Sequence, residues 1–282
     1  MKLLIPILSI SLASSLVATA QDNSQQPVEQ EISLNELKQA FPTAQDSGFG
    51  TIGIHAQIKV PEGLVFMSGT DGDKLLQSWG NLPSQFDGLI MPKDASWAIT
   101  FDFDPVGYVK DDEKEDIDAD EILENNQEAQ KAANKQRVAQ GLGELNILKW
   151  AVPPNYNTST NNLEWAMLLE DSEGNQTINL ETRLLGRHGV MSATLLCGPE
   201  QVEGLKPTLN TVLEGFEYKA GSKYGEYQEG DKVAEYGLLG LMGAGGAFVL
   251  WKFWKPISAG VVVFFVAVKK FAGRLFGSKQ EG

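Results

Sequence analysis

The stretch QTINLETRLLGRHGVMSATLLC, residues 176–197, decides the fold. It contains two apolar runs of strand length, and only the residues GRHG (186–189) separate them. A parallel partner strand needs a crossover of a dozen or more residues, so a connection this short predicts an antiparallel hairpin. In its turn we expect Gly186 and Gly189 to adopt positive φ angles, while Arg187 and His188 either face water or bind an anion.

The same pattern extends toward the N-terminus. LEWAMLLE (163–170) is strand-like, and the turn residues DSEGN (171–175) join it to the hairpin. LNILKWAV (145–152) precedes it and has the same apolar character. Short connections between consecutive runs predict neighbouring antiparallel strands, so these four runs form a meander.

Further segments supply strands and helices around this meander. TIGIHAQIKV (51–60) alternates apolar and polar residues, which predicts one half-buried strand with a solvated His55 on its polar face. Other predicted strands are 64–68, 97–103 and 216–220, and predicted helices start at Ser33, lie within 71–79, run from Asp118 to Gly141 and cover 199–215. Helices that cover a mainly antiparallel sheet define an α+β sandwich, and we expect one such domain over residues 33–220.

The N-terminus has the pattern of a secretion signal. Residues 1–20 combine a basic start, a short apolar run and the small residues Ala18-Thr19-Ala20, which predicts a signal peptide cleaved after Ala20. Residues 21–32 are polar and contain a proline, which indicates a linker. The mature domain is therefore expected outside the cytoplasm.

The stretch GLLGLMGAGGAFVLWKFWKPISAGVVVFFVAV, residues 237–268, is charged only at Lys252 and Lys255. A buried soluble helix normally has a polar stripe, which is missing here, so we interpret the stretch as a membrane anchor. It crosses the bilayer once, with the remainder in the interface, or twice as a short hairpin. The linker 221–236 is acidic and the tail 269–282 is basic. This asymmetry favours a single pass of the cytoplasmic membrane, with a cytoplasmic tail and a periplasmic domain.

Small residues recur four apart within this anchor. The two pairs are Gly240 with Ala244 and Gly243 with Ala247. Such pairs let two membrane helices approach closely, which predicts a homodimer. The ordinary glycine content of membrane helices explains the same residues equally well.

Composition limits both partners and chemistry. The chain has 282 residues, with 23 Lys and Arg against 37 Asp and Glu, and a formal charge of −14. Phosphate contacts need clustered basic residues, so this composition argues against nucleic acid as a partner. Cys197 is the single cysteine, which excludes an intrachain disulfide. The sequence contains neither a recognisable nucleophile motif nor a phosphate-binding loop, and we predict no cofactor.

Residues 102–124 contain eleven acidic side chains. A calcium loop needs oxygen ligands at fixed positions, and neither the frame that starts at Asp102 nor the one that starts at Asp116 supplies the full set. The alternatives are weak divalent binding and a solvated acidic loop in which Asp118 caps the next helix. No metal site is predicted.

A polar cluster around this loop is the candidate site. Asn134 and Arg137 lie three residues apart on one face of the helix that follows the loop. We expect Arg137 to pair with a carboxylate of residues 108–118, with Arg187 close to the same surface. The cluster either pins the loop to the sheet or binds a ligand. Its members are Tyr108, Asp111, Asp112, Asp118, Asn134, Arg137 and Arg187.

Six motifs resemble, in their order, the bacterial membrane-anchored family called domain of unknown function 2167. They are SWGNLP, GYVKDDEKEDIDADEIL, NKQRVAQG, KWAVPPNYNTSTNNLEWA, NLETRLLGRHGVMS and DKVAEYGLLGL, and they cover about residues 45–250. The resemblance implies a secreted domain with a C-terminal anchor and brings no established activity. WKFWKP departs from the smoother apolar end expected of the family. The matching positions are Gly107, Tyr108, Asp111, Asp112, Ile117, Asp118, Asn134, Arg137, Trp150, Pro154, Tyr156, Trp165, Leu185, Gly186, Arg187 and Gly189.

The end of the predicted domain also resembles PsbP-like α+β sandwiches, which is an analogy of fold only. We therefore predict a membrane-anchored extracytoplasmic protein of unknown activity. The favoured function is a non-enzymatic interaction or sensing module of the bacterial cell envelope, with the bilayer and an envelope protein as partners. The alternative is an envelope hydrolase or metal-assisted enzyme that uses the acidic loop 102–121.

Overall fold

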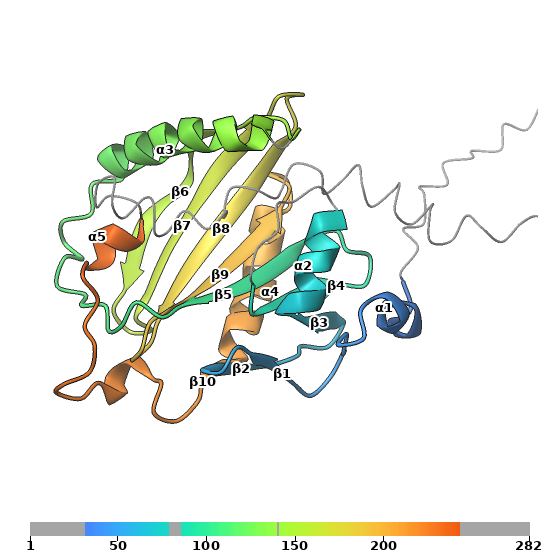
Figure 1. Ribbon diagram of the computed structural model, residues 1–282, viewed down its shortest axis with the longest axis horizontal. Helices are drawn as coiled ribbons and strands as arrows, with labels where there is room; N and C mark the ends of the chain where they lie inside the picture. Colours follow the sequence, from blue (N-terminus) through green and yellow to red (C-terminus); the bar gives the residue numbers. More distant parts are fainter. Residues whose placement is uncertain (1–31, 79–85, 140, 243–282) are drawn as a thin grey trace, which may run out of the picture. The chain divides into compact units, whose positions relative to one another are not determined.

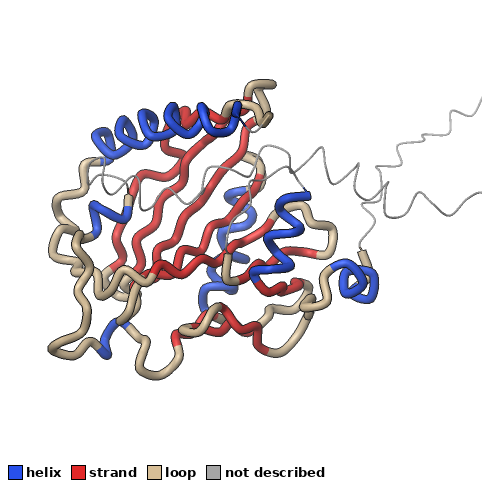
Figure 2. Tube along the Cα trace, viewed as in Figure 1, coloured by secondary structure: helices blue, strands red, loops and turns tan. Residues whose placement is uncertain are grey.

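The computed structural model describes residues 32–78, 86–139 and 141–242, which form two antiparallel sheets with helices packed against them (Figures 1 and 2). Within these residues the larger sheet has seven strands in the order β3-β4-β5-β9-β8-β7-β6, and the smaller has three in the order β1-β2-β10. The predicted α+β class with a mainly antiparallel sheet is confirmed.

Four strands of the larger sheet form the predicted meander, and each pairs antiparallel with the next. They are β6 (Leu145–Asn157), β7 (Asn162–Asp171), β8 (Gln176–Leu185) and β9 (Val190–Cys197). The sheet continues from β9 through β5 (Ala98–Asp104) and β4 (Gly88–Pro92) to β3 (Leu64–Ser68). The sequence pattern did not predict β4, because its residues GLIMP are a short apolar run without alternation.

The single strand predicted over residues 51–60 is wrong, because the chain forms a hairpin there. Gly53 has a φ of +52° in the turn, a conformation that side chains rarely allow, and Ile54 at the tip is 80% exposed. The apolar alternation continues through this turn, so periodicity alone did not locate it. The strands of the smaller sheet are β1 (Phe49–Ile52), β2 (Ala56–Lys59) and β10 (Phe216–Tyr218).

Two buried clusters hold these elements together. The first joins the larger sheet to the smaller sheet and to α4 (Val202–Glu214), whose Leu209 and Val212 are buried as their helical spacing predicts. The second joins the sheet to Ile122 of α3 (Ala119–Ala139). Figure 1 shows α4 behind the sheet and α3 along its β6 end.

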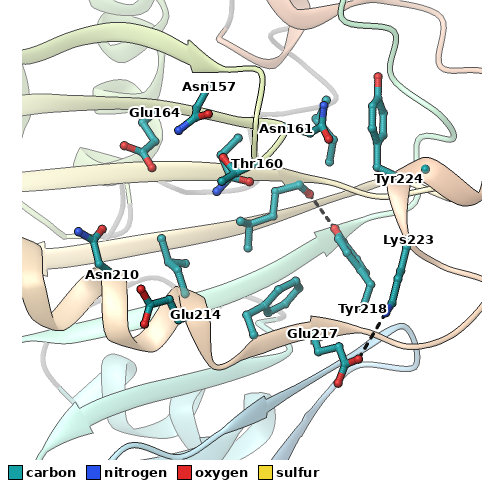
Figure 3. Close-up of a pocket in the computed structure, with 16 residues that line it drawn as sticks. Asn157, Thr160, Asn161, Glu164, Asn210, Glu214, Glu217, Tyr218, Lys223 and Tyr224 are labelled. Atoms are coloured by element: carbon teal, nitrogen blue, oxygen red, sulfur yellow. Dashed lines mark hydrogen bonds and ion pairs between the residues drawn. The ribbon is translucent and has the colours of Figure 1, made fainter.

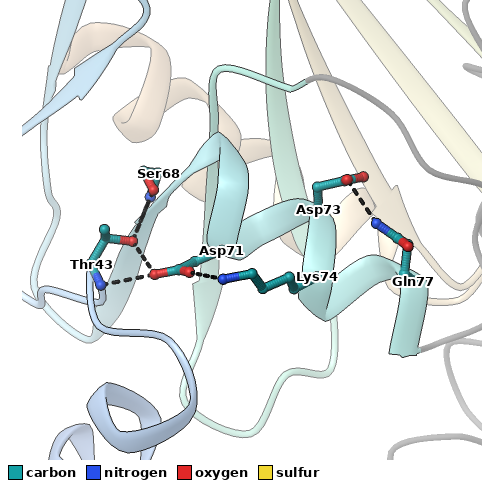
Figure 4. Close-up of polar contacts among 6 residues, drawn as sticks. All are labelled: Thr43, Ser68, Asp71, Asp73, Lys74 and Gln77. Atoms are coloured by element: carbon teal, nitrogen blue, oxygen red, sulfur yellow. Dashed lines mark hydrogen bonds and ion pairs between the residues drawn. The ribbon is translucent and has the colours of Figure 1, made fainter.

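Asp71 attaches α2 (Gly69–Ser78) to the chain that leads from α1 (Leu34–Ala40) into β1 (Figure 4). Its Oδ2 accepts hydrogen bonds from the backbone N–H of Thr43 at 2.9 Å and from the Thr43 hydroxyl at 2.6 Å. Burial favours the neutral carboxyl, but these bonds and the ammonium of Lys74 outweigh it and lower the pKa of Asp71. The carboxylate therefore fixes the N-terminal part of the chain to α2.

The folded part extends past the boundary predicted at residue 220. Residues 219–242, called the 219–242 segment below, contain η1 (Tyr224–Glu226) and α5 (Leu238–Leu241). Leu238, Leu241 and Met242 are buried in the second cluster. The prediction of a linker over 221–236 is therefore corrected, as is the start of the anchor at residue 237. Residues 221–236 are mostly polar, so their hydropathy does not predict packing. Many of their contacts are backbone hydrogen bonds and aromatic stacking.

Several sequence predictions fall outside the described residues. They are the signal peptide 1–20, nearly all of the linker 21–32, the apolar stretch beyond Met242 and the tail 269–282. In the part of the chain that the structure describes, no helix is both long and apolar enough to cross a membrane.

The predicted homodimer pairs are only partly within the described residues. Gly240 lies in α5 and is buried, and a Cβ there would stand 2.6 Å from the side chain of Tyr236. Gly240 thus packs inside the domain. Gly243, Ala244 and Ala247 lie outside the described residues, so the homodimer stays a prediction.

Candidate functional site

A cavity of about 640 Å³ lies between the larger sheet and the C-terminal end of α4 (Figure 3). The β6–β7 turn, β10 and the beginning of the 219–242 segment complete its walls. Four asparagines, three glutamates, one lysine and three aromatic side chains are among its lining residues. A cavity of this size with a mixed polar and apolar lining suits a small polar ligand.

Glu164 and Glu214 are unpaired carboxylates in this cavity. Within the residues that the structure describes, neither side chain forms a hydrogen bond or an ion pair. Glu164 is half-buried on β7, and burial raises the pKa of its carboxyl above the usual value. Figure 3 shows Glu164 with Glu214 and Asn210 of α4 at the same end of the cavity.

At the opposite end of the cavity, the polar side chains of Lys223, Glu217 and Tyr218 already have partners within the protein. Lys223 Nζ lies 3.4 Å from Glu217 Oε1, and both side chains are about half exposed. The hydroxyl of Tyr218 donates to Leu184 O at 2.7 Å and accepts from Met191 N at 3.0 Å. Tyr218 therefore fixes β10 to the hairpin of β8 and β9, and its ring forms part of the cavity wall.

Tyr108, a predicted site residue, lies behind the wall formed by Tyr224. Its ring centroid is 4.5 Å from that of Tyr224, with nearly parallel planes, and 4.3 Å from that of Tyr227. The Tyr224 hydroxyl donates to Val109 O at 3.0 Å. These contacts attach the 219–242 segment to the start of the acidic loop, and Tyr108 reaches the cavity only through Tyr224.

Asp111 lies behind another part of the wall. Its Oδ2 accepts a hydrogen bond from the Tyr156 hydroxyl at 3.0 Å, and the same hydroxyl accepts one from Asn161 Nδ2 at 3.1 Å. Burial raises the pKa of Tyr156 to about 12. Asn161 lines the cavity, so Asp111 positions a wall residue through Tyr156.

Arg187 and Tyr108 bind neighbouring residues of the 219–242 segment. Arg187 Nε and Nη2 donate to Asp231 Oδ2 and Oδ1 at 2.7 Å and 2.8 Å. Tyr108 N donates to Lys232 O at 2.8 Å. The two residues therefore hold the segment at adjacent points.

The glycines of the β8–β9 turn are needed for close packing. Gly186 and Gly189 are not among the described residues with positive φ, so that prediction is wrong. A Cβ at Gly189 would stand 2.0 Å from Asp104 O, and one at Gly186 would stand 2.8 Å from the Tyr218 ring. The turn therefore excludes side chains at both positions.

The acidic loop contributes helix caps. Asp118 Oδ1 accepts from the N–H groups of Asp120 and Glu121, both at 3.1 Å, so its predicted role as the cap of α3 is confirmed. Glu113 Oε2 accepts from Leu239 N at 3.1 Å at the start of α5. Asp112 is exposed. Among the described residues, no group of three His, Cys, Asp or Glu side chains is arranged to hold a metal ion.

Asn134 and Arg137 do not join this cluster. From Asp118 to Arg137 the helix rises by about 28 Å, which separates Arg137 from residues 108–118. Arg137 Nε donates to Gly143 O at 2.8 Å, and Asn134 Oδ1 accepts from Leu145 N at 3.0 Å. The two residues instead fix the start of β6 to the end of α3. The predicted pair between Arg137 and the acidic loop is wrong, because the length of α3 places Arg137 far from the loop.

Sequence reasoning also missed the association of the two histidines. The rings of His55 and His188 have centroids 5.7 Å apart, and His55 packs on Phe103 at 4.4 Å. Burial, together with His188, lowers the pKa of His55, which is half-buried rather than solvated as predicted. Cys197 is buried as predicted, and burial raises the pKa of its thiol to about 12.

Fold and cavity together define an α+β domain with a small polar cavity beside its meander. The chain belongs to the family described as protein of unknown function (DUF2167), which matches residues 46–271. The resemblance of the six motifs to that family is thus confirmed. Among solved structures, the chain is similar to the solution structure of cyanobacterial PsbP (CyanoP) from Synechocystis sp. PCC 6803, with 11% identity and a TM-score of 0.37. That match covers 63% of this chain and 93% of the other. Comparison with curated proteins gave no match.

Proposed function

We propose that the protein is a sensing module of the bacterial cell envelope that is anchored in the cytoplasmic membrane. Its extracytoplasmic domain binds a small polar ligand in the cavity beside α4. One observation carries the proposal: the cavity wall and the approach to the anchor belong to the same segment. Lys223, Tyr224 and Gly225 line the cavity, and the same segment leads through α5 to the apolar stretch beyond Met242.

The contacts of this segment give ligand binding a physical path toward the anchor. A ligand that shifts Tyr224 also disturbs Tyr108, which stacks on it. Tyr108 is in turn bonded to the next part of the segment, because its N–H donates to Lys232 O and its carbonyl accepts from Ala234 N, both at 2.8 Å. A contiguous packed network of this kind is one physical means of coupling two sites.

The proposed anchor is better matched to one crossing after residues 237–242 are assigned to the domain. As a helix, residues 237–268 would be about 48 Å long, whereas 243–268 would be about 39 Å long. The hydrocarbon core is about 30 Å thick, and a tilted helix accommodates a moderate excess. Together with the basic tail, this length supports a single pass with the domain on the periplasmic side.

Membrane attachment and orientation are tested with the full-length protein in its own membranes. We expect alkaline carbonate to leave the mature protein in the membrane pellet, and we expect protease added outside spheroplasts to digest the domain. Release by carbonate contradicts the anchor. Protection of the domain until the cells are lysed contradicts the orientation.

The sensing role is tested by placing a photo-crosslinking side chain at the cavity rim, at Asn210, in intact cells. Glu173 is the matched control, because it is exposed in the turn at the other end of β7. We expect a specific envelope component to crosslink at Asn210 and not at Glu173. Equal crosslinking at both positions, or at neither, contradicts the proposal.

A further inference from the structure

We propose that the cavity takes a small hydroxylated ligand with a primary ammonium group, the chemistry of an amino sugar, and that Glu164 binds the ammonium. The inference rests on the proposed ligand-binding function and adds the chemical class of the ligand. It follows from three properties of the cavity: its charge, the environment of Glu164 and its amide and aromatic lining.

The charge of the cavity favours a cation. Glu217 and Lys223 lie 3.4 Å apart and offset each other. Glu164 and Glu214 then leave two carboxylates without partners among the described residues, at the end of the cavity shown in Figure 3. An anionic ligand would meet this excess of negative charge with only one lysine to offset it, whereas an ammonium group would complement it.

Glu164 is the natural position for the ammonium, because its carboxylate is the less exposed of the two. Thr182 lies directly opposite Glu164 on the neighbouring strand β8, and it donates no hydrogen bond to the Glu164 carboxylate. Thr182 is fully buried, and its hydroxyl makes no hydrogen bond in the described part of the chain. A carboxylate that is partly removed from water and lacks a partner gains most from a cationic group that enters beside it. The raised pKa of Glu164 agrees with this arrangement.

The rest of the lining suits hydroxyl groups. Asparagine side chains on the β6–β7 turn and on α4 offer both donors and acceptors, and a sugar hydroxyl also needs both. The rings of Phe216 and Tyr224 supply apolar surface for the carbon skeleton of such a ligand. A purely apolar ligand would leave the amides and carboxylates unsatisfied.

Glucosamine and glucose are matched probes, because they differ only in the replacement of one hydroxyl by an amine. We expect calorimetric titration of the full-length protein near pH 6.5, where the amine is largely protonated, to give about tenfold tighter binding of glucosamine. Glu164→Gln keeps the shape of the side chain and removes its charge, so it should reduce glucosamine binding to the level of glucose. Glu173→Gln removes the same charge at the far end of β7, roughly 30 Å away, and should change neither affinity.

Each outcome decides a separate point. Equal affinity for the two sugars, or glucosamine binding that survives Glu164→Gln, overturns the ammonium site and leaves the proposed binding function standing. Binding of neither sugar overturns this ligand class, and the sensing function is then decided by crosslinking at Asn210. If Glu164→Gln does not fold, Glu164→Ala, which removes the carboxylate altogether, replaces it. We expect a several-fold loss of glucosamine affinity with no loss for glucose, and an unchanged ratio overturns the proposal.

Discussion

Arg187 and Asp231 are 44 residues apart in the chain and form a two-point ion pair, with Nε 2.7 Å from Oδ2 and Nη2 2.8 Å from Oδ1. Asp231 Oδ2 also accepts from Gln228 N at 2.7 Å, so the carboxylate orders its own loop as well. The pair therefore connects the β8–β9 turn of the meander to the segment that borders the cavity. Bidentate geometry of this kind specifies position as well as charge.

Arg187→Ala is expected to loosen the 219–242 segment while the meander stays folded. Hydrogen exchange measured by mass spectrometry should rise in residues 221–236 and stay unchanged in β8 and β9. Arg187→Lys keeps the charge but cannot form the two-point contact of the guanidinium, so the exchange rate in residues 221–236 should rise by an intermediate amount. Lys131→Ala breaks an exposed pair with Glu128 and serves as the control with little effect. Unchanged exchange in 221–236 of the alanine variant would contradict the role of the pair.

Acid is expected to weaken the same contact. The ion pair and the N–H of Gln228 lower the pKa of Asp231 from 3.8 to about 2. Because the folded-state pKa is the lower one, this stabilisation is present above pH 3.8 and is lost as the pH falls toward 2. Urea unfolding at decreasing pH should show a smaller loss of stability for Asp231→Asn than for the wild type. Asp112→Asn, at an exposed side chain, is the control that should follow the wild type.

Tyr218→Phe is expected to destabilise the whole domain. The substitution leaves the buried Leu184 O and Met191 N without their shared hydroxyl partner. An unsatisfied buried polar group costs about 1–3 kcal/mol, so the free energy of unfolding should fall by roughly that amount. Urea denaturation measures it. Tyr227→Phe, at an exposed ring, should change stability by less than about 0.5 kcal/mol, and equal losses in the two variants would rule out the explanation.

The meander and the helix caps were predictable because their signals are local. Four strand-like runs with short turns leave few alternatives, and Asp118 caps α3 through residues two and three positions away. The hairpin around Gly53 was missed, because apolar alternation looks the same in one strand and in two strands separated by a short turn. Apolar periodicity and turn residues are independent signals, and the alternation over residues 51–60 reports only the first.

The cavity was not predictable, because it depends on the packing of distant elements. Nothing in the sequence around Glu164 on β7 or Glu214 on α4 marks either as a site residue. Only the packing of α4 against the sheet brings the two into one cavity. Among the predicted residues, Tyr108, Asp111 and Arg187 do lie behind the cavity or fix its bordering segment. Arg137 does not, because it lies near the far end of the 21-residue helix that begins at the loop.

Gly107→Ala is expected to displace the 219–242 segment. Gly107 has a φ of +102°, and a Cβ there would stand 2.5 Å from Lys232 O, so the new methyl group would collide with the segment. Gly230→Ala is the matched control, because its φ is +94° and nothing lies within 4 Å of the added Cβ. Both variants carry a backbone strain of about 1–2 kcal/mol, and the difference between them isolates the collision. Thermal unfolding should show the larger loss for Gly107→Ala, and equal losses would contradict the close packing of these two chains.

The central claim is that occupancy of the cavity is transmitted through the 219–242 segment toward the proposed membrane anchor. Hydrogen exchange of the full-length protein in membranes, with and without saturating glucosamine, tests it most directly. We predict slower exchange both at the cavity wall around residues 157–164 and throughout residues 221–236, and Arg187→Ala should abolish the second effect while leaving the first. Protection that appears at the cavity wall while residues 221–236 exchange as fast as before would contradict the claim.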